Sequence, residues 1–132
     1  MNAAFELDSV TAVRGTQTIL KDLRQLIPQQ QVIALVGPNG AGKTTTLHAL
    51  SNIVKKTRGT VMFEGQGITR LAPDSIVRTG LIQVPEGRRI FANMSVHENL
   101  ELGAYTRTDR GGIKSDMEKV FTLFPRLKER IR

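Results

Sequence analysis

The sequence predicts an α/β protein organised around a buried parallel strand, a glycine-rich loop and a helix. Residues 32–36 (VIALV) form an unbroken apolar run, too short for a helix and typical of a strand covered on both faces. Residues 37–45 read GPNGAGKTT, and Leu47, Leu50 and Val54 then recur at helical spacing. The chain is therefore expected to run from a strand through a loop into a helix.

The glycine-rich loop has the spacing G-x-x-x-x-G-K-[ST], with Gly37, Gly42, Lys43 and Thr44 at the fixed positions. Glycine lets main-chain amides approach phosphate oxygens closely, and a helix starting near Gly42 adds its free first-turn amides. Lys43 is placed to reach the β- and γ-phosphates, and the Thr44 hydroxyl to bind Mg²⁺. The predicted contacts are Gly37, Pro38, Asn39, Gly40, Ala41, Gly42, Lys43, Thr44 and Thr45. The alternative interpretation is a glycine turn with an exposed lysine.

Two short patterns precede the loop and suggest a hairpin. Residues 5–7 and 10–13 are expected to form one strand arm, because apolar side chains recur along them. Gly15 turns the chain, and residues 19–27 return. This hairpin leads into the apolar run.

After the loop and its helix, residues 59–63 predict a strand and residues 64–67 its turn. Pro73 is expected to open a short helix that Gly80 ends, in agreement with the preference for proline at helix starts and glycine at helix stops. Residues 81–84 predict another short strand.

The last third of the chain is predicted to be helical. Residues 95–98 form an S-x-x-E capping box, which predicts a helix over about 96–105. Residues 115–118 repeat this pattern before a second helix, which Pro125 interrupts. Residues 106–112 are expected to be a polar loop between the two helices.

The composition is that of an ordinary globular protein of one domain, with 132 residues, 39% hydrophobic and 23% charged. No cysteine is present, which excludes disulfides and thiolate metal sites and fits a reducing compartment. The first ten residues lack the apolar core of a signal peptide, and no run approaches the roughly 20 apolar residues of a membrane span.

A net charge of +7 is the strongest compositional bias and suggests nucleic acid as a partner. The basic residues are, however, spread over four groups, at 21–24, 55–58, 88–89 and 128–132, and aromatic residues make up only 5%. The cations at 55–58 also suit the negative end of the helix that follows the loop. Nucleic acid is therefore not expected as a partner.

Residues 84–100 (VPEGRRIFANMSVHENL) resemble the Q-loop segment of ABC transporter ATPases, in the form typical of the branched-chain amino acid importer subfamily. Residues 124–130 (FPRLKER) resemble the start of the same subfamily's helical domain. The resemblance is collinear over nearly the whole chain. It implies a P-loop NTPase fold, with an ATP-binding core at 1–94 and the start of a helical subdomain at 95–132.

The resemblance also implies roles for particular residues. ATP and Mg²⁺ are expected as cofactors at the phosphate loop, with the Q-loop region at 84–91. Glu86 stands where most relatives have a Mg²⁺-coordinating glutamine, and a carboxylate is also a suitable ligand. Arg14 stands where relatives have an aromatic residue stacked on adenine; it is either a cation–π partner of the base or an exposed loop cation. Gln83 is assigned a mainly structural role.

Several family motifs are not found between residues 1 and 132. The LSGGQ signature, the strand ending in Asp and the catalytic Glu (Walker B), and the switch histidine are missing, so no catalytic residue is assigned. The segments RGGIKS at 110–115 and LIQVPE at 81–86 imitate the first two only superficially. The sequence thus predicts an incomplete ABC ATPase domain that binds ATP without hydrolysing it alone.

The family implies an ATPase whose activity is coupled to import of branched-chain amino acids. Its expected partners are ATP, a second ATPase subunit in a homo- or heterodimer, and transmembrane permease subunits. The expected location is peripheral, on the cytoplasmic face of the inner (plasma) membrane. Two alternatives stay open: a non-catalytic ATP-binding fragment, and a nucleic-acid-associated P-loop ATPase.

Overall fold

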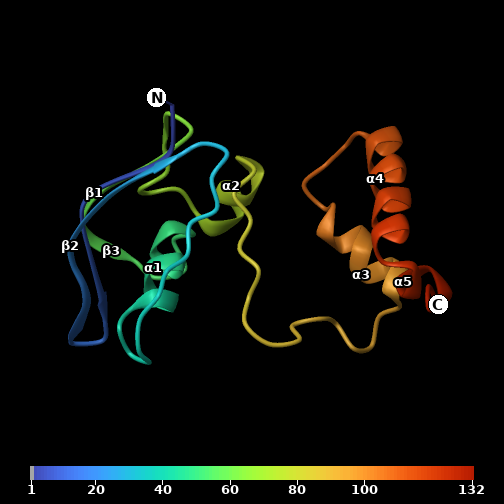
Figure 1. The fold of residues 1–132 in the computed structure, drawn as a ribbon, viewed down its shortest axis with the longest axis horizontal. Coiled ribbons are helices and arrows are strands. Elements are labelled where there is room, and N and C mark those ends of the chain that lie inside the picture. The colour runs from blue at the N-terminus through green and yellow to red at the C-terminus, as the bar shows by residue number, and fades with distance from the viewer. Residues whose placement is uncertain (1) are drawn as a thin grey trace. The chain divides into compact units, whose positions relative to one another are not determined.

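The computed structural model describes residues 2–132, which form a mixed α/β structure divided into two compact units. The first unit extends to Gln83 and contains all the strands and two helices, α1 and α2. The second unit, Val84–Arg132, contains helices α3, α4 and α5. Figure 1 shows the elements of each unit, which we describe separately.

The first unit is built on an antiparallel sheet with the strand order β2-β1-β3-β4. Its strands are β1 (Ala3–Arg14), β2 (Gln17–Pro28), β3 (Lys56–Phe63) and β4 (Gln66–Gly67). β1 lies between β2 and β3, with Leu7 opposite Gln25 on one side and Val61 on the other. The predicted hairpin and the strand with its turn at 64–67 are therefore confirmed.

A bulge in β1 decides which of its side chains face the core. Leu7, Val10 and Ala12 are all buried, although the first two are three residues apart and a regular strand alternates every two. Ser9 has a positive φ of 53°, and the register shifts between Leu7 and Val10. The extra residue returns Val10 to the buried face, as expected of a β-bulge.

Two helices supply the rest of the core. α1 (Lys43–Leu50) and α2 (Pro73–Arg78) each contribute one large buried side chain, Leu50 and Ile76. The main apolar cluster consists of Leu7, Val10, Leu50, Val61, Ile68 and Ile76. α2 begins at proline and is followed by Gly80, whose φ is 96°, so the predicted helix is confirmed.

The predicted buried strand at 32–36 and the predicted short strand at 81–84 are wrong for this structure. Neither segment is paired with a strand of the described sheet, which is antiparallel throughout. Val32 and Val36 are 100% and 93% exposed, and Ile82 is also largely exposed. The physical reason is that an apolar run becomes a buried strand only when neighbouring strands accept its backbone hydrogen bonds, and β1 to β4 pair with one another instead.

The second unit begins its helices with the predicted capping box. The Ser95 hydroxyl accepts a hydrogen bond from the Glu98 amide at 3.2 Å, and the Glu98 carboxylate accepts one from the Ser95 amide at 2.7 Å. The hydrogen bond from the Ser95 backbone amide, and after it the Ser95 side chain, lower the pKa of Glu98. The helix, α3 (Val96–Gly103), is slightly shorter than predicted.

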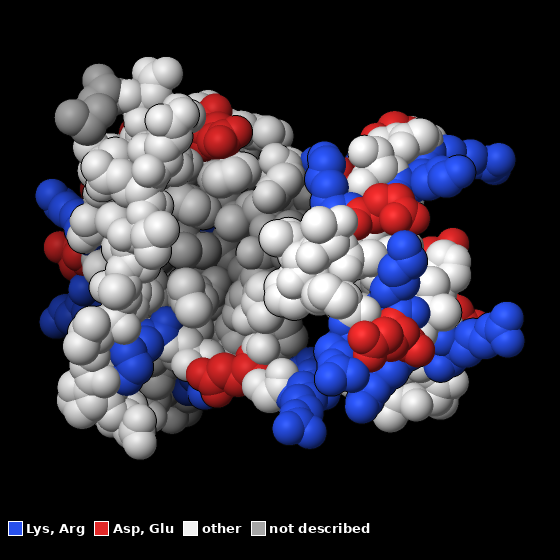
Figure 2. Space-filling view, turned by 45° about the vertical axis from the view of Figure 1, so that its right-hand side comes forward, with Lys and Arg blue, Asp and Glu red and all other residues white. Residues whose placement is uncertain are grey.

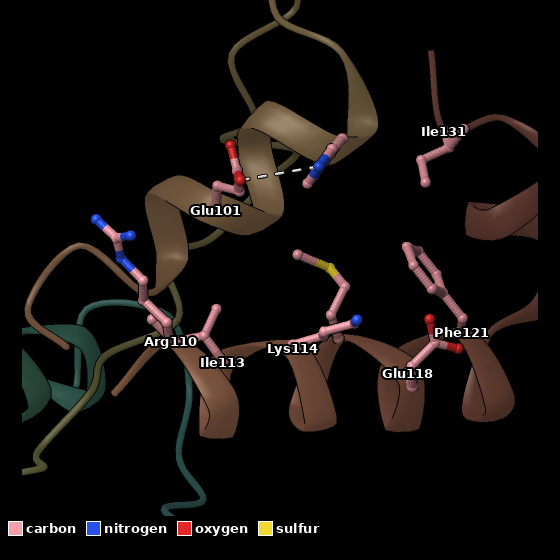
Figure 3. A pocket seen from close by; sticks show the side chains of 9 residues that line it. Glu101, Arg110, Ile113, Lys114, Glu118, Phe121 and Ile131 are labelled. Atoms are coloured by element: carbon pink, nitrogen blue, oxygen red, sulfur yellow. Dashed lines mark ion pairs between the residues drawn. The ribbon is translucent and has the colours of Figure 1, made fainter. Parts of the chain in front are cut away.

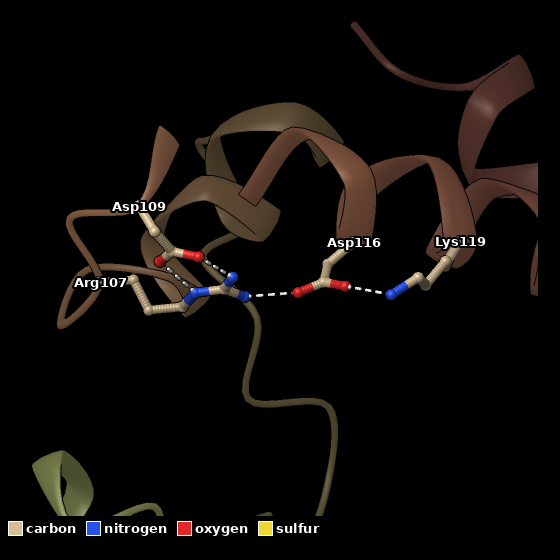
Figure 4. A network of polar contacts seen from close by, with 4 residues as sticks. All are labelled: Arg107, Asp109, Asp116 and Lys119. Atoms are coloured by element: carbon tan, nitrogen blue, oxygen red, sulfur yellow. Dashed lines mark hydrogen bonds and ion pairs between the residues drawn. The ribbon is translucent and has the colours of Figure 1, made fainter. Parts of the chain in front are cut away.

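The predicted capping box at 115–118 is wrong, because the second helix starts at Arg110, five residues before Ser115. α4 (Arg110–Leu123) includes the two glycines assigned to a loop, and α5 (Pro125–Glu129) follows the predicted interruption at Pro125. Arg107 explains the early start: it binds Asp109 twice, at 2.9 and 2.6 Å, and Asp116 at 2.6 Å (Figure 4). These ion pairs join the residue before α4 to its second turn.

The helices of the described chain are short. None of them is long and apolar enough to span a bilayer.

Candidate functional site

The glycine-rich loop has a backbone that few other residues tolerate. Gly40 and Gly42 have φ values of 85° and 98°, in the left-handed region that favours glycine. A Cβ atom on Gly42 would lie 3.3 Å from the Leu20 side chain, and one on Gly37 would lie 3.1 Å from Ala41 Cβ. The loop therefore needs glycine both for conformation and for space.

The loop leads directly into a helix N-terminus that lacks a side-chain cap. α1 begins at Lys43, with Gly42 as the N-cap residue, and no described side chain accepts a hydrogen bond at that cap. The first-turn amides of a helix have no intrahelical partner, and the helix dipole adds positive potential there. A phosphate group is the kind of acceptor that such an N-terminus binds.

Lys43 places its ammonium group over the start of the loop. Its Nζ donates hydrogen bonds to the carbonyl oxygens of Gly37 at 2.6 Å and Pro38 at 2.8 Å. The Pro38 carbonyl also accepts a bond from the Ala41 amide at 3.2 Å, which closes a turn through Asn39 and Gly40. The cation is thus fixed beside the glycines that the sequence paired with it.

The three threonines after Lys43 differ in their surroundings. Thr45 is buried, and the Thr46 hydroxyl donates to the Gly42 carbonyl at 2.8 Å, which steadies the first turn of α1. Thr44 lies in the same turn at the predicted Mg²⁺ position. Backbone amides, one ammonium and one hydroxyl are the groups that a Mg²⁺–triphosphate requires, so the residues present fit this ligand.

The other proposed metal ligand, Glu86, lies in the second unit, whereas Thr44 lies in the first. Glu86 is exposed, and its carbonyl accepts a hydrogen bond from Arg89 Nε at 3.3 Å. Within residues 2–132, no three His, Asp or Glu side chains gather to hold a metal. A Mg²⁺ ion that keeps several waters and phosphate oxygens does not need such a cluster.

Arg14 is the last residue of β1, where the chain turns into β2. It is exposed and pairs with Gln17 across the hairpin. β2 approaches the phosphate loop, since a Cβ on Gly42 would lie 3.5 Å from the Ile19 carbonyl. The strand that follows Arg14 therefore packs against the phosphate loop. Stacking of Arg14 on a base stays a prediction.

The structure adds residues that the sequence did not single out as important for the site. The Ser51 hydroxyl, at the end of α1, donates to Gln83 Oε1 at 2.7 Å, in agreement with the structural role assigned to Gln83. Lys56 donates to the Ala49 carbonyl at 2.6 Å, as expected for a cation near a helix C-terminus. No local pattern would have revealed the Ser51 contact, because its partners are 32 residues apart.

The second unit has a cavity of about 510 Å³ between α3, α4 and the C-terminal residues. Figure 3 shows Phe121 and Ile131 on one side and Glu101 on another, with His97 Nε2 3.7 Å from the Glu101 carboxylate. The His97 amide donates to the Ile131 carbonyl, so its backbone helps hold the C-terminal segment. The cavity is lined by His97, Glu101, Arg110, Ile113, Lys114, Met117, Glu118, Phe121 and Ile131.

A glycine loop with a fixed lysine at an uncapped helix N-terminus defines the class of phosphate-binding α/β proteins. Comparison with known families places the chain within that class, since the ABC transporter family model matches residues 20–131. This chain belongs to the ABC transporter family.

Individual relatives agree with the family assignment. The chain is 37% identical over 126 residues to the high-affinity branched-chain amino acid transport ATP-binding protein BraG of Pseudomonas aeruginosa, covering 96% of this chain and 54% of that protein. It is 34% identical to the probable branched-chain amino acid transport ATP-binding protein LivF of Archaeoglobus fulgidus, covering 83% of this chain and 46% of that protein. The chain spans about half the length of these relatives.

The solved structure of an ATP-binding subunit of an ABC transporter has a similar fold. It matches with a TM-score of 0.84 at 22% identity, covering 97% of this chain and 52% of that chain. The predicted fold class, an ABC ATPase nucleotide-binding domain, is therefore confirmed.

Proposed function

We propose that this chain binds MgATP through residues 37–45 as the nucleotide-binding part of an ABC importer ATPase. The observation that carries the proposal is the Lys43 ammonium, which is held by the Gly37 and Pro38 carbonyls next to an uncapped helix N-terminus. Lys43 would contact the β- and γ-phosphates, and Thr44 would supply a hydroxyl ligand to Mg²⁺. Glu86 and Arg14 are proposed as a second metal ligand and a base contact.

The importer role rests on the relatives' names. BraG and LivF are branched-chain amino acid transport ATP-binding proteins, so we propose the same solute class for the transporter to which this chain contributes. The proposed partners are transmembrane permease subunits and a second ATPase subunit, on the cytoplasmic face of the membrane. Because residues 1–132 contain no Walker B carboxylate or switch histidine, we propose that this chain alone binds ATP without turning it over.

The test is MgATP binding and phosphate release by the 132-residue chain. Lys43→Ala is expected to weaken ATP binding by about 10- to 100-fold, the loss of charge-assisted hydrogen bonds of about 1.5–3 kcal/mol. Unchanged affinity in Lys43→Ala would contradict the proposed site. Steady phosphate release that this substitution abolishes would contradict the proposal that the chain only binds.

A pair of threonine variants distinguishes the contribution of Mg²⁺ to ATP affinity from the contribution of the phosphate contacts. Thr44→Val is expected to remove the increase in ATP affinity that Mg²⁺ gives, while binding without Mg²⁺ is retained. Thr46→Val is the matched control, because its hydroxyl is already bonded to the Gly42 carbonyl. Equal loss of the Mg²⁺ effect in both variants would assign the change to helix α1 rather than to a metal ligand.

A further inference from the structure

The first unit also contains a pocket, which lies at the opposite end of α1 from the phosphate loop. It has a volume of about 370 Å³, which suits a small ligand. It is lined by Asn52, Lys55, Lys56, Thr69, Arg70, Leu71, Ala72 and Pro73. We call it the basic pocket. Since α1 has eight residues, or about 12 Å of helix, the basic pocket is distinct from the ATP site proposed above.

The charges around this pocket are all of one sign. Lys55, Lys56 and Arg70 line it, and no Asp or Glu does. Among the described residues, none of these three cations takes part in an ion pair, whereas Arg107, Lys119 and Arg126 do. Figure 2 shows that Lys and Arg commonly lie next to Asp and Glu on the face it draws. The basic pocket thus concentrates positive charge that the protein itself does not balance.

Lys56 is held in this pocket by a fixed set of contacts. Its Nζ donates to the Ala49 carbonyl at 2.6 Å and to Asn52 Oδ1. Asn52 is itself anchored, because its Nδ2 donates to the carbonyls of Ile68 at 2.8 Å and Leu71 at 2.7 Å. An ammonium group has three donors, so two bonds to protein acceptors leave one for a ligand.

Burial of Lys56 also favours binding of an anion, because an anion would stabilise its partly desolvated ammonium group. Removal from water lowers the pKa of Lys56 to about 8, and no carboxylate lines the pocket to offset this effect. An exposed surface lysine would be solvated and would need no partner. Lys56 is instead half-buried and immobilised, and two exposed cations stand at the same cavity.

We infer that the basic pocket binds the phosphate group of a small ligand. Lys56 supplies a fixed donor from inside the pocket, and Lys55 and Arg70 supply charge from its rim. Charge-assisted hydrogen bonds from such donors are the strong contacts by which proteins hold phosphate. The ligand's phosphate comes either from a soluble phosphate monoester or from a lipid headgroup. Both present anionic phosphate oxygens, although a monoester carries up to two negative charges and a lipid phosphodiester carries one.

The test uses inorganic phosphate as the probe and the full chain carrying Lys43→Ala, so that the phosphate loop is silenced. A titration followed by amide NMR is expected to shift Asn52, Lys56 and Arg70 in a saturable manner, and to raise the pKa of Lys56. Shifts confined to residues 37–45, or shifts that never saturate, would overturn the inference. The spread of amide signals reports whether the chain is folded.

Charge-matched variants make the test specific. Lys55→Gln and Arg70→Gln are each expected to weaken phosphate binding at least about fivefold. Both side chains are exposed, and neither takes part in an ion pair among the described residues. Lys114→Gln, in α4, removes the same charge outside the basic pocket and is expected to have no effect. An equal loss in all three variants would show attraction to net charge and would overturn the inference.

Vesicles distinguish the two sources of phosphate. If the ligand is a lipid, the chain is expected to sediment with phosphatidylglycerol vesicles but not with phosphatidylcholine vesicles, and Arg70→Gln is expected to abolish this. If neither vesicle binds while inorganic phosphate still saturates the pocket, the ligand is a soluble phosphate monoester. Vesicle binding that Arg70→Gln does not change, together with no saturable phosphate binding, would contradict both.

Discussion

Each of the two units of this molecule is stabilised internally by a different kind of contact. In the first unit, side chains from β1, β3, α1 and α2 form a shared apolar cluster in which Val10 and Val61 are completely buried. In the second unit, Phe121 is the buried apolar residue among those described, and capping bonds and ion pairs define the helices. Apolar burial is non-directional, whereas polar contacts depend on geometry, pH and salt.

This comparison teaches that the two units respond to different perturbations. The first unit is expected to lose stability when its apolar packing is altered, or when the close approach of the β1 and β3 backbones is disturbed. The second is expected to respond to loss of individual hydrogen bonds and to acid. The predictions below test this difference, from the largest expected effect to the smallest.

The largest effect is expected at Gly59, where β3 crosses β1. Its φ is 90°, and a Cβ atom would lie 2.5 Å from the Ser9 carbonyl carbon and oxygen. Gly59→Ala is therefore expected to destabilise the first unit by roughly 4 kcal/mol, measured as loss of hydrogen-exchange protection in β1. Gly65→Ala is the control, since φ is 79° but no atom lies within 4 Å, and strain alone costs about 1 kcal/mol. Equal effects would refute a backbone clash.

The next effect separates a buried valine from an exposed one. Val61→Ala removes methyl groups from the centre of the core and is expected to lower the free energy of unfolding by about 2 kcal/mol. Val36→Ala, in the apolar segment before the phosphate loop, is expected to change it by less than about 0.5 kcal/mol, because Val36 is 93% exposed. Urea unfolding followed by circular dichroism measures both. A large loss in Val36→Ala would mean that residues 32–36 are packed in solution.

In the second unit, Asn99 is the residue whose loss should matter most. Its Nδ2 donates to the carbonyls of Phe91, Met94 and Ser95, and its Oδ1 accepts from the Phe91 amide at 3.0 Å. Asn99→Ala is expected to cost about 1–2 kcal/mol of local stability, read as faster hydrogen exchange at the Phe91 amide. The exposed Asn93, two residues after Phe91, provides the control variant Asn93→Ala, and matching rates in the two variants would contradict this anchoring role.

The smallest effect is expected on acidification. Hydrogen bonds from Lys119 and then Arg107 lower the pKa of Asp116 to about 2. Because the folded pKa lies below the unfolded value near 3.9, this stabilisation is present above about pH 4 and is lost as pH falls towards 2. Protection of α4 amides is expected to fall over that range, and Asp116→Asn should remove the dependence. A variant with an unchanged acid profile would show that other carboxylates control α4.

Much of the local structure was predictable from sequence, because its signals lie within a few residues. The capping box at Ser95, the proline start of α2 and the glycine loop before Lys43 all involve neighbours in the chain. The α4 start was not predictable in this way. Its position depends on ion pairs of Arg107 that reach nine residues ahead, and they override a nearby S-x-x-E pattern.

The same difference between local and long-range contacts applies to the functional residues. Gly37, Gly42 and Lys43 follow from motif spacing, and the structure places them in one loop and at the start of the helix that follows it. The anchoring of Lys56 by Asn52 was not foreseen, because Asn52 is itself fixed by carbonyls 16 and 19 residues further along. A motif specifies contacts along the chain, whereas such an anchor depends on how separate segments meet.

The sequence by itself determined the phosphate loop, the turns and most helix starts, since short-range sterics and hydrogen bonds dictate them. Only the tertiary structure decided which apolar segments are buried. Val10 and Val36 have the same side chain, yet one is fully covered and the other is exposed. The reason is that a strand is buried by partners distant in the chain, and a local pattern does not specify whether those partners pair with it.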